Sequence, residues 1–399
     1  MKLFKKGELN LLWPFYVESI VPYILHFAWI FMIPYFTELG LSIFQIGILL
    51  AVAPLFTLLF EVPTGAFADL YGRKNSVLLG YLLEGLGFIS LFFFQEFYLI
   101  LGSIALIGFG GTFSSGAKEA WVTDLIKSKR KDFLHGYFVK VQIIGGIGLL
   151  CAGIVGALFV KHFGLRIIWI TGFSSFILSI VFLLFANEHF IKREVRISQS
   201  LKNIKKQSLK SISYSKRHPV LFYFLMASAI LGFATSFAVA LTFTPYLSSL
   251  GLKDHYFGYL GSAMALMGVL ASIMGSKLYS KGKERNFIIS SILIWILIAL
   301  SIIFVNKLVF VIIVLLGLVF MSSIKSPVER VYFHKYIPSK LRASIGSVES
   351  MVLAIIGIIS FPLVGLTVDL IGPKYTIFLA GILALPSLII YYKIKDAPK

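Results

Sequence analysis

Long apolar stretches separated by short polar segments make up most of the chain. Twelve of them hold roughly 20 or more mostly apolar residues, the length that an α-helix needs to cross a bilayer. We expect helices because an open sheet edge cannot satisfy its hydrogen bonds in hydrocarbon. The predicted membrane helices cover residues 11–36, 42–68, 76–95, 97–123, 136–160, 165–187, 219–246, 255–278, 286–305, 308–333, 343–368 and 375–393.

The second half of the sequence repeats the first. Residues 33–41, IPYFTELGL, match residues 244–252, TPYLSSLGL, at an offset of 211. Further along, Glu119 meets Glu329 at an offset of 210. Because this period is about half of the chain, it indicates duplication of a six-helix unit.

The repeat predicts the domain organisation. We expect an all-α membrane protein in which residues 1–187 and residues 219–399 form two pseudo-symmetric six-helix bundles. An even number of helices in each half gives both halves the same orientation. Parallel repeats of this kind place the substrate site at their interface near the membrane midplane.

The composition agrees with a chain that is solvated largely by lipid. Hydrophobic residues make up 58% of the sequence and charged residues 14%, and the mean hydropathy is +0.90. A soluble domain has about a quarter of its residues charged. No P-loop pattern, metal-ligand spacing or nucleophile–base set is present in the sequence, so we expect no cofactor, no metal and no enzymatic activity.

The basic residues predict the orientation in the membrane. If the N-terminus is cytoplasmic, 28 of the 37 Lys and Arg residues lie in cytoplasmic segments, and 5 lie in segments on the outer side of the membrane. This bias places both termini in the cytoplasm of a multi-pass protein of the cell membrane. Nine of the basic residues lie in residues 188–218, which we interpret as a cytoplasmic linker. The net charge of +19 therefore needs no nucleic-acid partner.

A short motif lies between the second and third predicted helices. Residues 65–74 read GAFADLYGRK and contain Gly65, Asp69, Gly72, Arg73 and Lys74. The stretch resembles the signature of the major facilitator superfamily, G-x-x-x-D-[RK]-x-G-R-[RK], in the loop where that family carries it. It departs from the signature at Leu70, where the family usually has a basic residue.

The resemblance implies a conformational latch. In the family, the motif aspartate and arginine form a charge cluster with an acidic residue at the end of the fourth helix, and Asp124 occupies that place here. The cluster closes the cytoplasmic side in the outward-facing state. We therefore expect a latch of Gly65, Asp69, Gly72, Arg73, Lys74 and Asp124.

Two partial motifs bear on the direction of transport. Antiporters of the family carry G-x-x-x-G-P-x-x-G-G in the fifth helix. The fifth and eleventh predicted helices keep parts of this pattern at Gly148, Gly153, Gly156, Gly357, Pro362 and Gly365. Small residues at this spacing also serve general packing of membrane helices. The arginine that the family's drug antiporters carry in the fourth helix maps to Ala105.

Ionisable residues inside membrane helices are costly, so they are functional candidates. The helices that line the cavity in this family are the first, fourth, seventh and tenth, and a buried carboxylate there can carry a proton. We expect Lys325 and Glu329 to neutralise each other, because they are four residues apart, and Lys118 and Lys140 to extend toward the cytoplasm. The candidates for coupling or substrate binding are Glu18, His26, Glu61, Glu119, Glu329 and Arg330.

These features favour a monomeric secondary transporter that moves a small solute through the lipid bilayer by alternating access. The first hypothesis is efflux of small amphipathic compounds in exchange for protons. The second is uptake or facilitated diffusion of a metabolite. The third, a receptor or scaffold that does not transport, predicts large soluble appendages.

Overall fold

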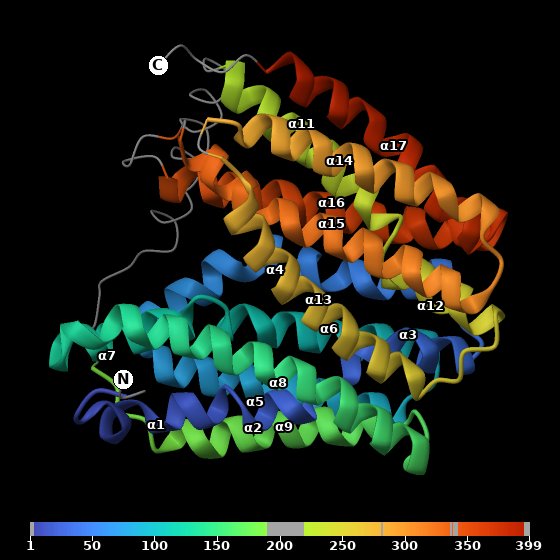
Figure 1. Cartoon of the computed structure of the whole chain (residues 1–399). Helices are drawn as coiled ribbons and strands as arrows, with labels where there is room; N and C mark the ends of the chain where they lie inside the picture. Colours follow the sequence, from blue (N-terminus) through green and yellow to red (C-terminus); the bar gives the residue numbers. More distant parts are fainter. Residues whose placement is uncertain (1–3, 190–218, 281, 336, 338–341, 395–399) are drawn as a thin grey trace. The chain divides into compact units, whose positions relative to one another are not determined.

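The computed structural model describes residues 4–189, 219–280, 282–335, 337 and 342–394 (Figure 1). In this part of the chain all regular structure is helical, and twelve helices are long and apolar enough to cross a membrane. Each of the twelve predicted segments coincides with one of these helices. Of the predicted linker, residues 188–218, all but the first two residues lie outside the described ones, so the linker stays a prediction.

The helices before residue 190 are α1 (Glu8–Glu18), α2 (Val21–Leu25), α3 (Ala28–Glu38), α4 (Ile43–Tyr71), α5 (Arg73–Phe93), α6 (Phe97–Ser114), α7 (Ala117–Lys129), α8 (Leu134–Phe163) and α9 (Ile167–Leu184), with a short 3₁₀ turn, η1 (Lys131–Phe133). Those after residue 218 are α11 (Pro219–Ser236), α12 (Ala240–Ser249), α13 (Tyr256–Leu278), α14 (Glu284–Ser301), α15 (Leu308–Lys335), α16 (Arg342–Ile371) and α17 (Pro373–Lys393), with a second 3₁₀ turn, η2 (Ile302–Phe304).

Three of the membrane spans are interrupted helices. The first span is divided into α1, α2 and α3, the fourth into α6 and α7, and the seventh into α11 and α12. The fourth breaks at Gly116, whose φ of +68° is a backbone conformation that favours glycine. A membrane protein tolerates such breaks where other protein segments or a cavity cover the freed backbone groups.

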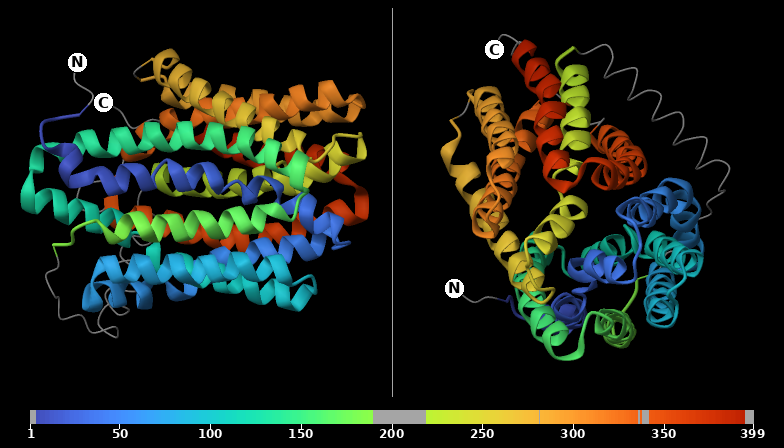
Figure 2. Two further views of the ribbon diagram at one scale, coloured as in Figure 1. Left: turned by 90° about the horizontal axis from the view of Figure 1, so that it is seen from below. Right: turned by 90° about the vertical axis from the view of Figure 1, so that its right-hand side faces the viewer.

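The chain divides into two compact units. Unit 1 contains the described residues of Met1–Tyr35, Val52–Leu201 and Asp254–Ser262, and unit 2 contains those of Phe36–Ala51, Lys202–Lys253 and Ala263–Lys399. In unit 1, α5 packs against both α6 and α9. In unit 2, α11 and α14 both pack against α17 (Figures 1 and 2). The predicted domain boundaries at residues 187 and 219 stay a prediction.

Glycines allow the backbones of α5 and α6 to approach closely. A Cβ atom added to Gly80 would lie 2.7 Å from the carbonyl oxygen of Gly110, and one added to Gly110 would lie 2.8 Å from the oxygen of Gly80. These distances are too short for any side chain, so the two helices touch at a pair of glycines. Such contacts drive packing in lipid, where apolar side chains gain little from leaving the solvent.

The glycines of the fifth-helix motif lie at similar contacts in unit 1. Cβ atoms added to Gly148 and Gly156 would lie 3.1 Å from Tyr23 and 2.7 Å from Phe31. One added to Gly153 would lie 2.4 Å from the oxygen of Gly258 at the start of α13. This close contact explains why residues 254–262 belong to unit 1.

The eleventh-helix motif packs in the same way in unit 2. Gly357, Pro362 and Gly365 all lie in α16. A Cβ atom added to Gly365 would lie 2.3 Å from the oxygen of Ile43, and one added to Gly47 would lie 2.3 Å from the oxygen of Phe361. The first turn of α4 is therefore in backbone contact with α16.

We predict that Gly110→Val destabilises the folded protein by about 1–3 kcal/mol, because the added methyl groups would collide with backbone atoms of α5. The matched control is Gly102→Val on the same helix, where an added Cβ would meet no described atom within 4 Å. The measurement is the apparent melting temperature in detergent. Equal melting temperatures for the two variants would show that the glycine contact is not needed.

Candidate functional site

A polar cavity lies within unit 2. Its volume is about 280 Å³, and α11, α14, α15 and α16 line it. The polar lining residues are Ser228, Thr235, Ser291, Ser322, Lys325, Ser326, Glu329, Arg330 and Glu349. The apolar ones are Phe224, Leu231, Gly232, Ile292, Trp295, Met321, Phe333 and Leu353. Apolar walls combined with polar groups are typical of sites for small molecules.

Three neighbouring side chains hold the Glu329 carboxylate in this cavity. Lys325 forms an ion pair with its carboxylate, as the spacing of four residues predicts. The Tyr391 hydroxyl donates a hydrogen bond of 2.7 Å to Oε1 of Glu329, and the Ser228 hydroxyl lies 3.3 Å from the same atom. Three helices, α11, α15 and α17, therefore fix one carboxylate.

Arg330 is in a different situation. It lines the cavity and is exposed. Within the described part of the chain, its guanidinium has neither a hydrogen bond nor an ion pair. Glu349, the second carboxylate of the cavity, takes part in an interaction of its own. The cavity thus holds the Lys325–Glu329 ion pair, the Glu349 carboxylate and a guanidinium that none of the described residues binds.

Unit 1 contains a second carboxylate held by a lysine and a tyrosine. Glu18, at the end of α1, pairs with Lys118 of α7, and its side chain is only 3% exposed. The Tyr81 hydroxyl donates a hydrogen bond of 2.9 Å to Oε1 of Glu18. Lys118 can reach Glu18 because α7 begins just before it, after the break at Gly116. A buried charge of this kind is stable in a membrane helix only when it is paired.

The other intramembrane candidates take no part in the hydrogen bonds and ion pairs of these two networks. Nδ1 of His26 lies 3.2 Å from the Ser175 hydroxyl, and the ring packs against Phe88 and Phe176. Glu61 and Glu119 are exposed, and neither carboxylate has a hydrogen-bond or ion-pair partner among the residues that the structure describes. Their predicted role in coupling stays a prediction.

The residues of the predicted latch mostly form one cluster in unit 1. Arg73 lies 2.5 Å from the Asp124 carboxylate and 3.9 Å from that of Asp69. Gly72, with φ of +98°, makes the turn between α4 and α5. A Cβ atom added to Gly65 would meet no described atom within 4 Å, so Gly65 makes no close helix contact in this structure.

Glu188 belongs to this region, although the sequence analysis did not select it. Its carboxylate accepts a hydrogen bond of 3.0 Å from the backbone N–H of Lys74, at the start of α5. The Lys74 ammonium donates to the carbonyl oxygens of Leu184 and Ala186, each at 2.8 Å, at the end of α9. Each charge thus lies at the helix end whose dipole attracts it.

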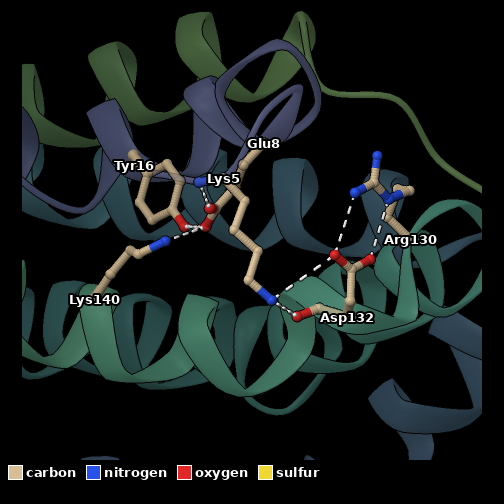
Figure 3. A network of polar contacts seen from close by, with 6 residues as sticks. All are labelled: Lys5, Glu8, Tyr16, Arg130, Asp132 and Lys140. Atoms are coloured by element: carbon tan, nitrogen blue, oxygen red, sulfur yellow. Dashed lines mark hydrogen bonds and ion pairs between the residues drawn. The ribbon is translucent and has the colours of Figure 1, made fainter. Parts of the chain in front are cut away.

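Glu8 is a further buried carboxylate that the sequence analysis missed (Figure 3). It is 1% exposed and accepts hydrogen bonds from Lys140 at 2.5 Å, from the Tyr16 hydroxyl at 2.6 Å and from the backbone N–H of Lys5 at 2.8 Å. Buried carboxylates hold both Lys118 and Lys140, and the expectation that these side chains extend toward the cytoplasm stays a prediction.

An exposed ion-pair group lies beside Glu8 (Figure 3). Arg130 lies 3.1 Å from the Asp132 carboxylate, and the Lys5 ammonium donates to the backbone oxygen of Asp132 at 2.7 Å. The hydrogen bond from Arg130 to Asp132 raises the pKa of the Arg130 guanidinium.

In the described part of the chain, no group of three or more His, Cys, Asp or Glu residues is placed to hold a metal ion.

Known proteins with similar sequences are transporters. The chain is 24% identical to the uncharacterized MFS-type transporter YxaM of Bacillus subtilis (strain 168), over 88% of each chain. It is 26% identical to the uncharacterized transporter BU466 of Buchnera aphidicola, over 63% of each chain. It is also 26% identical to the multidrug resistance protein MdtH of Salmonella typhimurium (strain LT2), over 36% of this chain and 35% of MdtH.

The fold has a close counterpart among solved structures. The crystal structure of a mutant of the nucleoside transporter NupG matches with a TM-score of 0.80 at 15% identity, and the match covers 97% of this chain and 100% of that one. This likeness confirms the predicted fold class, an all-α membrane protein with twelve membrane helices. The model of the Major Facilitator Superfamily matches residues 19–360. The chain therefore belongs to the major facilitator superfamily, and it is a multi-pass secondary transporter of small molecules rather than an enzyme.

Proposed function

We propose that the protein exports small amphipathic compounds in exchange for protons, by alternating access. The observation that carries this proposal is the cavity of unit 2, where apolar walls surround a carboxylate that a lysine and a tyrosine hold in place. The apolar walls suit an amphipathic solute. The carboxylate, Glu329, suits a proton carrier, because a proton on it would break the ion pair with Lys325 and so change the charge of the cavity.

The network around Glu329 gives proton binding a structural consequence. When Glu329 is ionised, it neutralises Lys325 and accepts the Tyr391 hydrogen bond. A proton on Glu329 removes the charge that holds Lys325, so the ammonium becomes available to other groups in the cavity. The charge that a solute meets therefore depends on whether the proton is bound. Coupling between proton binding and solute binding requires a dependence of this kind.

The name of one relative supports export over uptake. MdtH is a multidrug resistance protein, and it is similar to about a third of this chain.

We propose further that both termini and the Asp69–Arg73–Asp124 cluster are cytoplasmic and that the transporter works as a monomer. The bias of basic residues supports this orientation.

Transport should follow a proton gradient and need no nucleotide. In proteoliposomes without ATP, we expect an imposed pH gradient to drive accumulation of some members of a panel of amphipathic cations, anions and neutral compounds. Glu329→Gln should abolish accumulation but retain exchange of solute for solute, because a glutamine cannot carry the proton. The control is Glu96→Gln at the exposed start of α6, which should transport normally.

Three results would contradict this function. Strict dependence on ATP would exclude secondary transport. Transport rates that do not change with the pH gradient would favour the alternative, facilitated diffusion. Normal gradient-driven accumulation by Glu329→Gln would show that another group carries the proton.

The charge cluster of unit 1 should act as a latch on the cytoplasmic side. Partly exposed ion pairs contribute about 0–1 kcal/mol each, and about 1.4 kcal/mol changes a conformational ratio tenfold. We therefore expect Asp124→Asn and Asp69→Asn to populate inward-facing states and to slow turnover. Asp124→Asn should act more strongly, because Asp124 lies nearer to Arg73.

Distances between spin labels on the cytoplasmic ends of α7 and α15 report this shift. The control is Asp132→Asn, which also removes a cytoplasmic ion pair, with Arg130. If both latch variants keep the distance distribution and the turnover of the wild type, the cluster has no role in gating.

A further inference from the structure

Polar side chains without partners form a stripe on one wall of the unit 2 cavity. Ser322, Ser326 and Arg330 follow one another at intervals of four residues along α15, so they form a stripe about 12 Å long on one face of the helix. All three are exposed and line the cavity. Within the described residues, none of the three side chains has a hydrogen-bond partner, whereas Lys325 and Glu329, on the neighbouring positions, are paired.

One charged group of the cavity is available to bind a ligand. Lys325 and Glu329 neutralise each other, and Glu349 is engaged in an interaction of its own. The Arg330 guanidinium forms no hydrogen bond or ion pair with the described residues, so its donors are available to a ligand. A guanidinium binds a carboxylate or phosphate through two parallel hydrogen bonds. A phosphate monoester carries about −1.5 to −2 charges at pH 7, more than Arg330 alone can balance, whereas a carboxylate carries one.

The rest of the lining determines what the anion is attached to. Trp295, on α14, is almost fully buried, and Leu231, Ile292 and Leu353 add apolar surface from α11, α14 and α16. Such walls bind an aromatic or branched apolar body through its buried area. The hydroxyls of Ser322 and Ser326 can donate to a polar atom between that body and the anion.

We propose that this cavity binds amphipathic monocarboxylates, with the carboxylate on Arg330 and the apolar body against Trp295. This inference rests on the proposed export function and narrows it to one class of solute. It assigns to Arg330 a direct role in choosing the solute, and to Glu329 the separate role of carrying the proton. The site therefore discriminates by charge among compounds that have the same apolar body.

The test compares each carboxylate with its uncharged amide. The probes are tritiated naphthalene-1-acetate, indole-3-acetate and 4-phenylbutyrate, each with the corresponding amide, and equilibrium binding is measured on the full-length protein in nanodiscs. For at least one pair, we expect wild-type protein to bind the carboxylate about tenfold more tightly than the amide. A difference of this size is what one hydrogen bond to a charged group contributes. Arg330→Gln should remove this preference, and Arg330→Lys should keep part of it.

Two controls separate a local effect from misfolding or loss of surface charge. Amide binding depends on the apolar walls, so it should be equal in Arg330→Gln and wild type if the cavity is intact. Lys277→Gln removes an exposed charge at the end of α13 that does not line the cavity, and it should leave the preference unchanged. Equal binding of acid and amide in all three pairs, or a preference that survives Arg330→Gln, would overturn the proposal.

The same proteins in proteoliposomes distinguish this inference from the function on which it rests. Transport of cations or neutral compounds in exchange for protons, without preference for carboxylates, would preserve the export function and refute the anion site. Carboxylate binding that depends on Arg330, without any transport driven by a pH gradient, would preserve the site and refute proton-coupled export.

Discussion

A charge that is buried inside a membrane helix needs a partner within the protein, because hydrocarbon cannot solvate it. Three carboxylate–lysine pairs meet this requirement here: Glu8 with Lys140, Glu18 with Lys118, and Glu329 with Lys325. A tyrosine hydroxyl also donates to each carboxylate. The first two pairs connect helices that are distant in the sequence, and the Tyr391 hydrogen bond connects α17 to the third pair, which lies within α15. Neutralising the charges therefore also fixes the packing of these helices.

This constraint explains features of the backbone that otherwise have no clear purpose. The fourth span breaks at Gly116, and the new helix that begins at Ala117 places Lys118 against Glu18. Close glycine contacts bring the helices together, as at Gly80 and Gly110 in unit 1 and at Gly365 and Ile43 in unit 2. Small residues and paired charges therefore supply the attraction that the hydrophobic effect does not provide between helices in lipid.

The twelve spans could be predicted from the sequence because they depend on apolar length, and the fold class could be predicted because the second half of the sequence repeats the first. The Lys325–Glu329 pair was also predictable, because both residues lie on one helix at a spacing of four. The partners of Glu18, Glu8 and Lys74 were not, because they are 100, 132 and 114 residues away in the chain and only tertiary packing brings them together. The break between α11 and α12 contains neither glycine nor proline, so it could not be predicted from the local sequence.

The site shows the same limit. The sequence singled out ionisable residues of the predicted helices, and it placed Glu329 and Arg330 in the same group of candidates for coupling or substrate binding. The cavity distinguishes the two: Glu329 is held by Lys325 and Tyr391, whereas Arg330 forms no hydrogen bond or ion pair with the described residues. Glu61 and Glu119, chosen by the same criterion, lie outside both charge networks.

The central claim is that each intramembrane carboxylate and its lysine are stable only as a pair. A double-mutant cycle on Glu18 and Lys118 tests this most directly, with unfolding free energies measured in nanodiscs for Glu18→Gln, Lys118→Met and the double variant. Each single variant should lose about 3–5 kcal/mol, because it leaves one buried charge without its partner, and the double variant should recover most of that loss. Losses that simply add in the double variant would contradict the claim.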